Sequence, residues 1–71
     1  MHEKEFLSVI IPNYNGRHII GRVLDSLKKQ SYDIDFLEII VVDDASNDGS
    51  VEYIRQVYPF VAVIRNRRRK G

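Results

Sequence analysis

The chain of 71 residues predicts an α/β fold, a three-stranded parallel sheet whose elements follow the order β-α-β-α-β. Three short apolar runs, at residues 6–11, 36–42 and 61–64, have the length and the β-branched content of buried strands. The two segments between them place apolar residues at three- and four-residue spacing, which is typical of amphipathic helices. Because strands that alternate with helices usually pair in parallel through right-handed crossovers, this order favours one parallel sheet.

The first strand and helix are predicted at residues 6–30. Phe6 to Ile11 is an almost continuous apolar run, the pattern of a strand buried on both faces. Pro12 lacks an N–H group and is expected to end the ladder, followed by a turn at Asn13 to Gly16. A helix is expected from Arg17 to about Gln30, with Asn15 as its N-cap.

The same pattern returns after a polar loop at Ser31 to Asp35. A second buried strand is predicted over Phe36 to Val42, and Asp43 to Gly49 is a loop rich in residues that favour turns and caps. A second helix should end at Pro59, and the third strand is expected over Val61 to Ile64. The residues expected to cap the second helix are Asn47, Asp48 or Ser50.

Composition and charge narrow the class of protein. The apolar share of 44% and charged share of 30% are those of a globular chain, and the length allows one domain with a small core. With no cysteine, disulfides are excluded. No signal peptide or membrane-spanning run is visible, so the expected location is the cytoplasm or the cytoplasmic face of a membrane.

Five of the eleven basic residues gather at the carboxyl end of the chain. Such a run can bind nucleic acid or anionic lipid, but charge runs at a terminus are more often solvated and frayed. We therefore predict a disordered basic tail at residues 67–71 and no specific nucleic-acid partner. The five residues are Arg65, Arg67, Arg68, Arg69 and Lys70.

Polar side chains follow the first two predicted strands. In an open parallel sheet, ligands bind outside the carboxyl ends of the strands. Tyr14 could stack there on a base, or it could simply cover the core. Asp43 and Asp44 could accept hydrogen bonds from a uracil N–H or a ribose hydroxyl, could bind a divalent metal, or could only shape the turn. Since adjacent side chains on a strand point in different directions, one carboxylate can hold the backbone while the other faces a ligand.

Other common catalytic and nucleotide-binding signals are missing from the sequence. There is no glycine-rich dinucleotide fingerprint after the first strand and no phosphate-binding P-loop. His2 and His18 are isolated and are interpreted as surface residues.

Three motifs in order resemble the amino-terminal part of family 2 glycosyltransferases, which have the GT-A (Rossmann-like) fold. The resemblance runs from about Leu7 to Asn66. It rests on Ser8-Val9-Ile10-Ile11-Pro12-Asn13-Tyr14-Asn15, on Leu24-x-x-Leu27-x-x-Gln30-Ser31-Tyr32, and on the long segment from Glu38 to Ser50. It implies that residues 1–66 are a truncated GT-A subdomain, the nucleotide-binding half of that fold.

The resemblance also implies a ligand and the residues that bind it. The ligand would be a nucleotide-diphosphate-sugar donor, with a uridine diphosphate (UDP) sugar favoured. Pro12 and Tyr14 match residues that line the base pocket, with Asn15 beside them. Asp44 matches the aspartate that contacts the base, and Asp43 its partner, which supports the ribose side or the loop.

The family transfers the sugar to a hydroxyl acceptor with the help of Mg²⁺ or Mn²⁺, which neutralises the diphosphate. Its metal-binding Asp-x-Asp motif and its catalytic carboxylate would lie beyond residue 71, because no Asp or Glu follows Glu52. We therefore assign neither a catalytic residue nor a metal ligand within the chain, and we expect these residues by themselves not to transfer sugar.

Two other functions remain open from the sequence. An aspartate pair after a strand can hold Mg²⁺ in phosphoacceptor modules, although in such modules the pair follows the first strand. A non-catalytic, self-associating α/β domain is the other alternative. In the GT-A sheet the first strand is central, so Leu7 to Ile11 would present an unpaired apolar edge. This predicts a homodimer or larger assembly through that edge.

Overall fold

The computed structural model describes residues 6–30 and 36–68. The predicted loop at residues 31–35 and the last tail residues, 69–71, lie outside the described residues. The three strands form one parallel sheet in the order β1-β2-β3, which confirms the predicted α/β fold. In chain order the elements are β1 (Phe6–Asn13), α1 (Arg17–Gln30), β2 (Phe36–Asp44), α2 (Ser50–Val57) and β3 (Ala62–Asn66).

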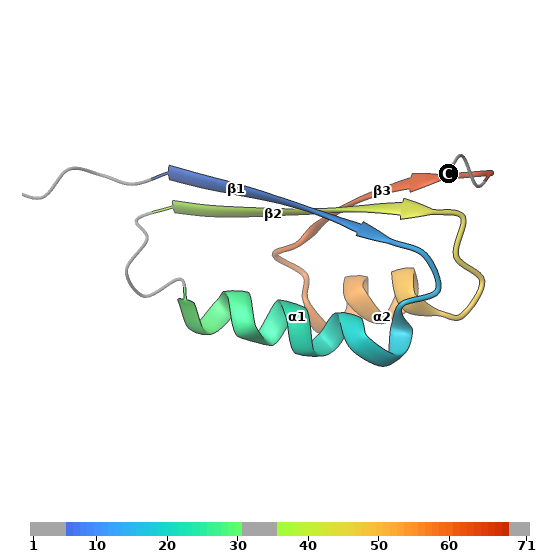
Figure 1. Ribbon diagram of the computed structural model, residues 1–71, viewed down its shortest axis with the longest axis horizontal. Helices are drawn as coiled ribbons and strands as arrows, with labels where there is room; N and C mark the ends of the chain where they lie inside the picture. The colour runs from blue at the N-terminus through green and yellow to red at the C-terminus, as the bar shows by residue number, and fades with distance from the viewer. Residues whose placement is uncertain (1–5, 31–35, 69–71) are drawn as a thin grey trace, which may run out of the picture.

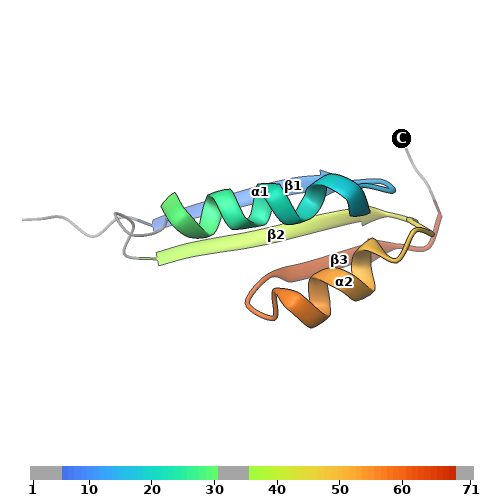
Figure 2. The same cartoon turned by 90° about the horizontal axis from the view of Figure 1, so that it is seen from below.

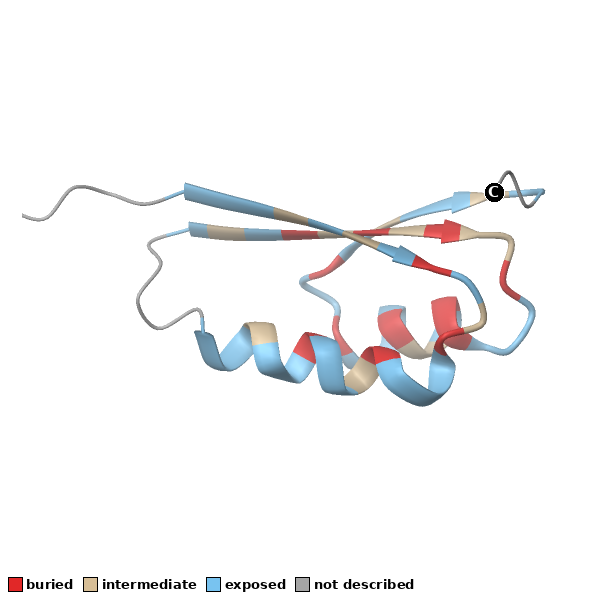
Figure 3. Cartoon of the chain, viewed as in Figure 1, coloured by how far each residue is buried: buried red, intermediate tan, exposed pale blue. Residues whose placement is uncertain are grey.

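The molecule has two layers. Both helices lie on the same face of the sheet (Figure 1). In the view from the helix side, α1 runs along β1 and β2, while α2 lies over β3 (Figure 2). Figure 3 shows that buried residues lie on both layers. The core consists of apolar side chains from the helices, the sheet and their connections, which are removed from water where they pack together. Its buried members are Ile20, Leu24, Ile39, Val41, Ile54, Tyr58 and Val61.

The arrangement of both helices on one face corrects one prediction. The first strand was expected to be buried on both faces, but Phe6 is 72% exposed and Ile10 is 66% exposed. Only one face of β1 turns toward α1, where Val9 and Ile11 are half-buried. A continuous apolar run cannot show by itself whether one or two layers cover the strand.

The strands are longer than predicted. The expectation that Pro12 ends the ladder is wrong, because Pro12 is in register with Val42 and β1 continues to Asn13. Within the described residues β1 is an edge strand, where a residue without an N–H is tolerated. The strand β2 likewise extends to Asp44, since its last residues pair with the end of β3.

The alternation of side chains along β2 separates the two aspartates. Ile39, Val41 and Asp43 are buried, whereas Val42 and Asp44 lie on the other side and are half-buried. Because successive residues of a strand point to opposite faces, Asp43 turns into the helix layer and Asp44 turns away from it.

The two helices are joined by a tyrosine. The Tyr58 hydroxyl donates to Asp25 Oδ1 at 2.8 Å and approaches the Gly21 carbonyl at 3.2 Å. Burial, together with the hydrogen bond to Asp25, raises the pKa of Tyr58. Gly21 also lies against a second tyrosine, since a Cβ there would lie 2.9 Å from the Tyr53 hydroxyl. In the described parts of the chain, no helix is both long and apolar enough to cross a membrane.

Candidate functional site

The carboxyl ends of all three strands meet at one end of the sheet (Figure 1). Two loops leave this end and lead into the helices. The first loop, residues 14–16, follows β1, and the second loop, residues 45–49, follows β2. The residues predicted to bind the donor lie in these loops or in the strand ends beside them. They are Pro12, Tyr14, Asn15, Asp43 and Asp44.

A buried hydrogen-bond network lies beneath the loops, and Asp43 is its centre. Asp43 is fully buried. Its Oδ1 accepts from Asn13 Nδ2 at 2.8 Å and from the Ser46 hydroxyl at 2.7 Å, and its Oδ2 accepts from the Ser46 N–H at 2.9 Å. Asn13 Nδ2 also donates to the Ser50 hydroxyl at 3.0 Å. Since a buried carboxylate costs free energy unless it is hydrogen-bonded, these donors keep Asp43 stable in place.

The network forms because the strands are in register. Asn13 and Asp43 are Cα partners at the ends of β1 and β2. Asn13 is itself almost fully buried. Gly16 leaves room for its side chain, since a Cβ at Gly16 would overlap Asn13 Oδ1. Both carboxylate oxygens of Asp43 are thereby occupied by protein donors, and Asp43 supports the loop.

Further hydrogen bonds join the first loop directly to the second. The Asn15 N–H donates to the Ser46 hydroxyl at 2.8 Å, and Asn15 Oδ1 accepts from the Asn47 N–H at 2.9 Å. The prediction that Asn15 caps α1 is therefore wrong. The Gly16 carbonyl accepts the first helical hydrogen bonds instead, and the Arg17 N–H donates across to Asp48 Oδ2 at 2.9 Å.

Two non-glycine residues of these loops have left-handed backbones. Asn15 has φ 51° and Ala45 has φ 60°. Asparagine tolerates this region, whereas alanine rarely adopts it, so the surrounding contacts must hold Ala45 there. Backbone strain of this kind persists only where neighbouring structure fixes it, and it is concentrated at functional sites.

The start of α2 is capped in a way that the sequence only partly predicted. The N-cap position is Gly49, with φ 81° and no side-chain cap. Asp48 instead accepts the Ser50 N–H at 3.0 Å. Burial opposes ionisation of Asp48, but hydrogen bonds from Ser50 and from the Arg17 N–H outweigh it and hold the pKa of that carboxyl below its usual value of 3.8. Asp48 therefore remains charged where it joins the two loops.

Other predicted site residues reach solvent. Tyr14 is 46% exposed, Pro12 is exposed, and Asp44 is half-buried. Asn66 Nδ2 lies 3.5 Å from Asp44 Oδ1, so the end of β3 adjoins this carboxylate. Next to it is a hollow of about 440 Å³, half of whose lining is polar. The hollow is lined by Ala45, Ser46, Asn47, Arg65, Asn66 and Arg67.

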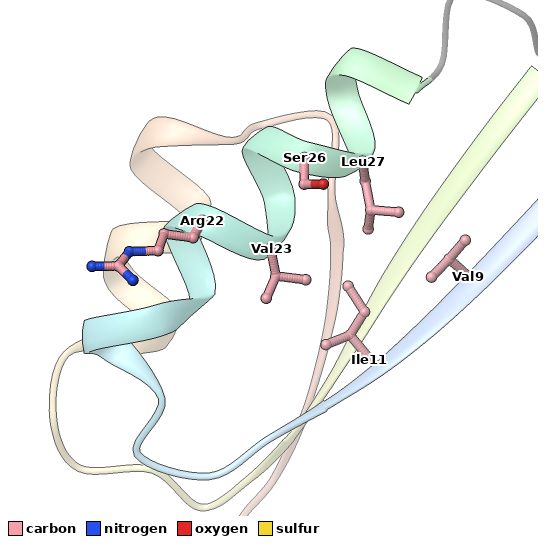
Figure 4. Close-up of a pocket in the computed structure, with 6 residues that line it drawn as sticks. All are labelled: Val9, Ile11, Arg22, Val23, Ser26 and Leu27. Carbon is pink, nitrogen blue, oxygen red and sulfur yellow. The ribbon is translucent and has the colours of Figure 1, made fainter.

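A second hollow, of about 410 Å³, lies away from the strand ends, between α1 and β1 (Figure 4). Its surface is almost wholly apolar, and none of the predicted site residues lines it. It is lined by Val9, Ile11, Arg22, Val23, Ser26 and Leu27.

The structure adds three residues to the predicted set. Asn13 was interpreted as a turn residue, and Ser46 and Arg65 received no role in the site. Arg65 Nη2 donates to the Ser46 carbonyl at 3.1 Å and its Nη1 lies 3.5 Å from Glu52 Oε2. The register of β1 against β2 would have indicated Asn13, because it places that amide directly opposite Asp43.

The residues of this site do not fit a metal ion. Within residues 6–30 and 36–68, no group of three or more His, Cys, Asp or Glu side chains lies close enough to hold one. Asp43 has both oxygens engaged by protein donors.

Comparison with known proteins identifies the family. Residues 8–71 match the model of the family described as glycosyl transferase family 2. The chain belongs to this family. The predicted resemblance is thus confirmed over nearly all of the chain, and with it the GT-A form of the α/β fold.

Individual glycosyltransferases show how the chain relates to whole family members. The mannosyltransferase PcManGT of Pyrobaculum calidifontis, solved in complex with GDP-Man and Mn²⁺, superposes with a TM-score of 0.80 at 34% identity over 97% of this chain. The poly(ribitol-phosphate) beta-glucosyltransferase of Bacillus spizizenii is 42% identical over 70% of the chain, and glycosyltransferase AglE of Haloferax volcanii is 43% identical over 72%. The chain spans 21%, 8% and 17% of the lengths of these three proteins, respectively.

Proposed function

We propose that this chain binds the nucleoside part of a nucleotide-diphosphate-sugar donor and that it forms the donor-binding part of a glycosyltransferase. The observation that supports the proposal is that two adjacent aspartates lie in different surroundings. Asp43 is buried and holds the loops, while Asp44 and Tyr14 reach the surface at the carboxyl ends of the strands. This is the edge at which open α/β sheets bind nucleotides.

The chemistry of these two side chains suits a nucleoside. The Tyr14 ring offers a face on which a base stacks, and Pro12 supplies apolar surface nearby. Asp44 is an acceptor for the imide N–H of uracil or guanine, or for a ribose hydroxyl. The similarity to a mannosyltransferase solved with GDP-Man supports a nucleotide-sugar ligand. We favour uridine as the base, and guanosine is the alternative to be compared directly.

In this proposal the parent enzyme transfers the sugar to a hydroxyl acceptor, and the chain contributes binding and orientation of the donor. The Mg²⁺ or Mn²⁺ ion that family members use would be held by carboxylates outside these residues, and so would the group that deprotonates the acceptor. We therefore expect the 71 residues alone to bind the nucleotide without transferring sugar.

Titration of the isotope-labelled chain with UDP and with guanosine diphosphate (GDP) tests the proposal. We expect a dissociation constant of about 1 mM, equivalent to about −4 kcal/mol, because the chain supplies only one side of the ligand's surroundings. Chemical-shift changes should gather at residues 12–15 and 43–46. Tyr14→Ala and Asp44→Asn should each weaken binding.

The matched control is Asp25→Asn, which neutralises a carboxylate on α1 away from the strand ends and should leave binding unchanged. Shift changes confined to Arg65 through Arg68 would mean attraction between phosphate and arginine alone. That result would contradict the proposed site.

We also propose that the isolated chain forms a homodimer through β1. The outer edge of β1 has no strand partner among the described residues, and Phe6 and Ile10 on it are exposed. Unpaired apolar edges recruit other chains. A two-fold axis normal to the sheet would pair the two β1 strands antiparallel.

Sedimentation equilibrium at tens of micromolar tests this assembly. We expect a mass of about twice the 8.3 kDa of one chain. Ile10→Glu should shift the species to monomer, whereas Ile64→Glu, a comparably exposed position on β3, should not. A wild-type monomer with exchange-protected Val9 and Ile10 amides would show that the edge is covered within one chain.

A further inference from the structure

Ser46 is the one residue of the second loop that is hydrogen-bonded to the ends of β1, β2 and β3 within the described part of the chain. Its hydroxyl donates to Asp43 Oδ1 at 2.7 Å and accepts the Asn15 N–H at 2.8 Å, with Asn13 Nδ2 at 3.4 Å. Its N–H donates to Asp43 Oδ2, and its carbonyl accepts from Arg65 Nη2 at 3.1 Å. Ser46 is almost fully buried, with 4% exposed.

The side chain of Ser46 is turned into the protein. Its hydroxyl donates to Asp43 and accepts from Asn15, and the residue is almost fully buried. A ligand at the surface therefore does not reach this hydroxyl. Its contribution to ligand binding must act through its neighbours.

Those neighbours flank the residues proposed to contact the nucleoside. Tyr14 lies between Asn13 and Asn15, both of which Ser46 contacts. Asp44 lies between Asp43, which Ser46 contacts, and Ala45, whose backbone is left-handed. Fixing these flanking residues fixes the backbone on both sides of Tyr14 and Asp44.

We propose that Ser46 is the positioning residue of the donor site. Through its buried hydroxyl it holds the two loops as one unit, so that Tyr14 and Asp44 are already placed before the ligand arrives. This inference rests on the proposed function, and it adds that the site is preorganised, which lowers the ordering cost of binding. The carbonyl of Ser46 extends the same unit to β3 through Arg65.

Removal of the Ser46 hydroxyl should affect the hydrogen bonds that it makes and also hydrogen bonds elsewhere in the two loops. In Ser46→Ala the Asn15 N–H and one Asp43 oxygen each lose a partner. If the loops form one unit, the hydrogen bonds from Asn47 to Asn15 and from Arg17 to Asp48 open more often as well, although neither involves Ser46. Ser46→Thr keeps the hydroxyl and should restore them.

The experiment combines amide hydrogen exchange with nucleotide titration on the full chain. In Ser46→Ala we expect faster exchange at Asn15, Asn47 and Arg17, with no change at Leu24 and Val41. We expect UDP binding, or GDP binding if that nucleotide is preferred, to weaken about fivefold, equivalent to about 1 kcal/mol. Ser46→Thr should bind within about twofold of wild type.

Tyr58→Phe is the control for general destabilisation. It removes the hydrogen bond to Asp25 between the helices, away from the two loops. It should lower the free energy of unfolding and leave the dissociation constant unchanged. Equal weakening of binding in Tyr58→Phe and Ser46→Ala would mean that Ser46 affects binding only through the overall stability of the chain. That result would overturn the proposal.

The remaining outcomes separate this inference from the proposed function. If wild type binds and Ser46→Ala binds equally well, or if Asn47 and Arg17 keep their protection, the positioning role is wrong while the donor site stands. If wild type binds neither nucleotide, the donor site itself is wrong and the positioning role is overturned with it.

Discussion

Replacement of Asp43 by alanine is expected to remove a large part of the free energy of unfolding of the chain. Three buried hydrogen bonds end on this carboxylate, from Asn13 Nδ2 and from the N–H and hydroxyl of Ser46. Each buried donor left without a partner costs roughly 1–3 kcal/mol, so we expect a total loss of at least about 3 kcal/mol. A chain of this length has a total stability on the order of 4–11 kcal/mol, which such a loss reduces severely.

Urea unfolding followed by circular dichroism measures this loss, with Asp44→Ala as the matched control. Asp44 is the adjacent aspartate, but it lies on the other side of β2 and is only half-buried. Its replacement should cost about 1 kcal/mol or less. Equal losses for the two variants would contradict the claim that Asp43 supports the loops while Asp44 faces the ligand.

Leu24→Ala is expected to have the second large effect. Leu24 is fully buried on α1 and belongs to the core cluster with Ile39 and Ile54. Truncation removes apolar contacts and leaves a cavity between the helix and the sheet, for which we expect a loss of about 3 kcal/mol. The free energy of unfolding from a urea titration is the readout.

Val23→Ala is the control on the same helix turn. Val23 is 38% exposed and borders the apolar hollow outside the core. Its truncation should cost less than about 1 kcal/mol, since water already reaches the side chain. A loss as large as that of Leu24→Ala would mean that the face of α1 toward this hollow is covered in solution.

The order and type of every described element could be predicted from the sequence, because each depends on local periodicity. The three- and four-residue spacing of Ile20, Leu24 and Leu27 fixes the helix, and the β-branched run of β2 fixes the central strand. The burial of β1 could not be predicted in the same way, because it depends on which face the helices cover. Right-handed crossovers along a sheet of order β1-β2-β3 place both helices on one face.

Several residues of the candidate site could be picked out from the sequence, but the contacts that they make could not. The strand ends pointed to Tyr14, Asp43 and Asp44, but Asn15 has an intrinsic preference for helix caps that a contact across the loops overrides. Pairings such as Asn13 with Asp43 join residues far apart in the chain, and they depend on the register of the sheet. Sequence patterns within one segment do not contain that register.

The most direct measurement for the central claim is a set of intermolecular nuclear Overhauser effects between labelled chain and bound UDP. We expect contacts from the base and ribose protons of the nucleotide to the ring protons of Tyr14, with the amides of Asp44 and Ala45 also perturbed. Contacts from the nucleotide only to Arg65 through Arg68, or to Val9, Ile11 and Val23 in the apolar hollow, would contradict it.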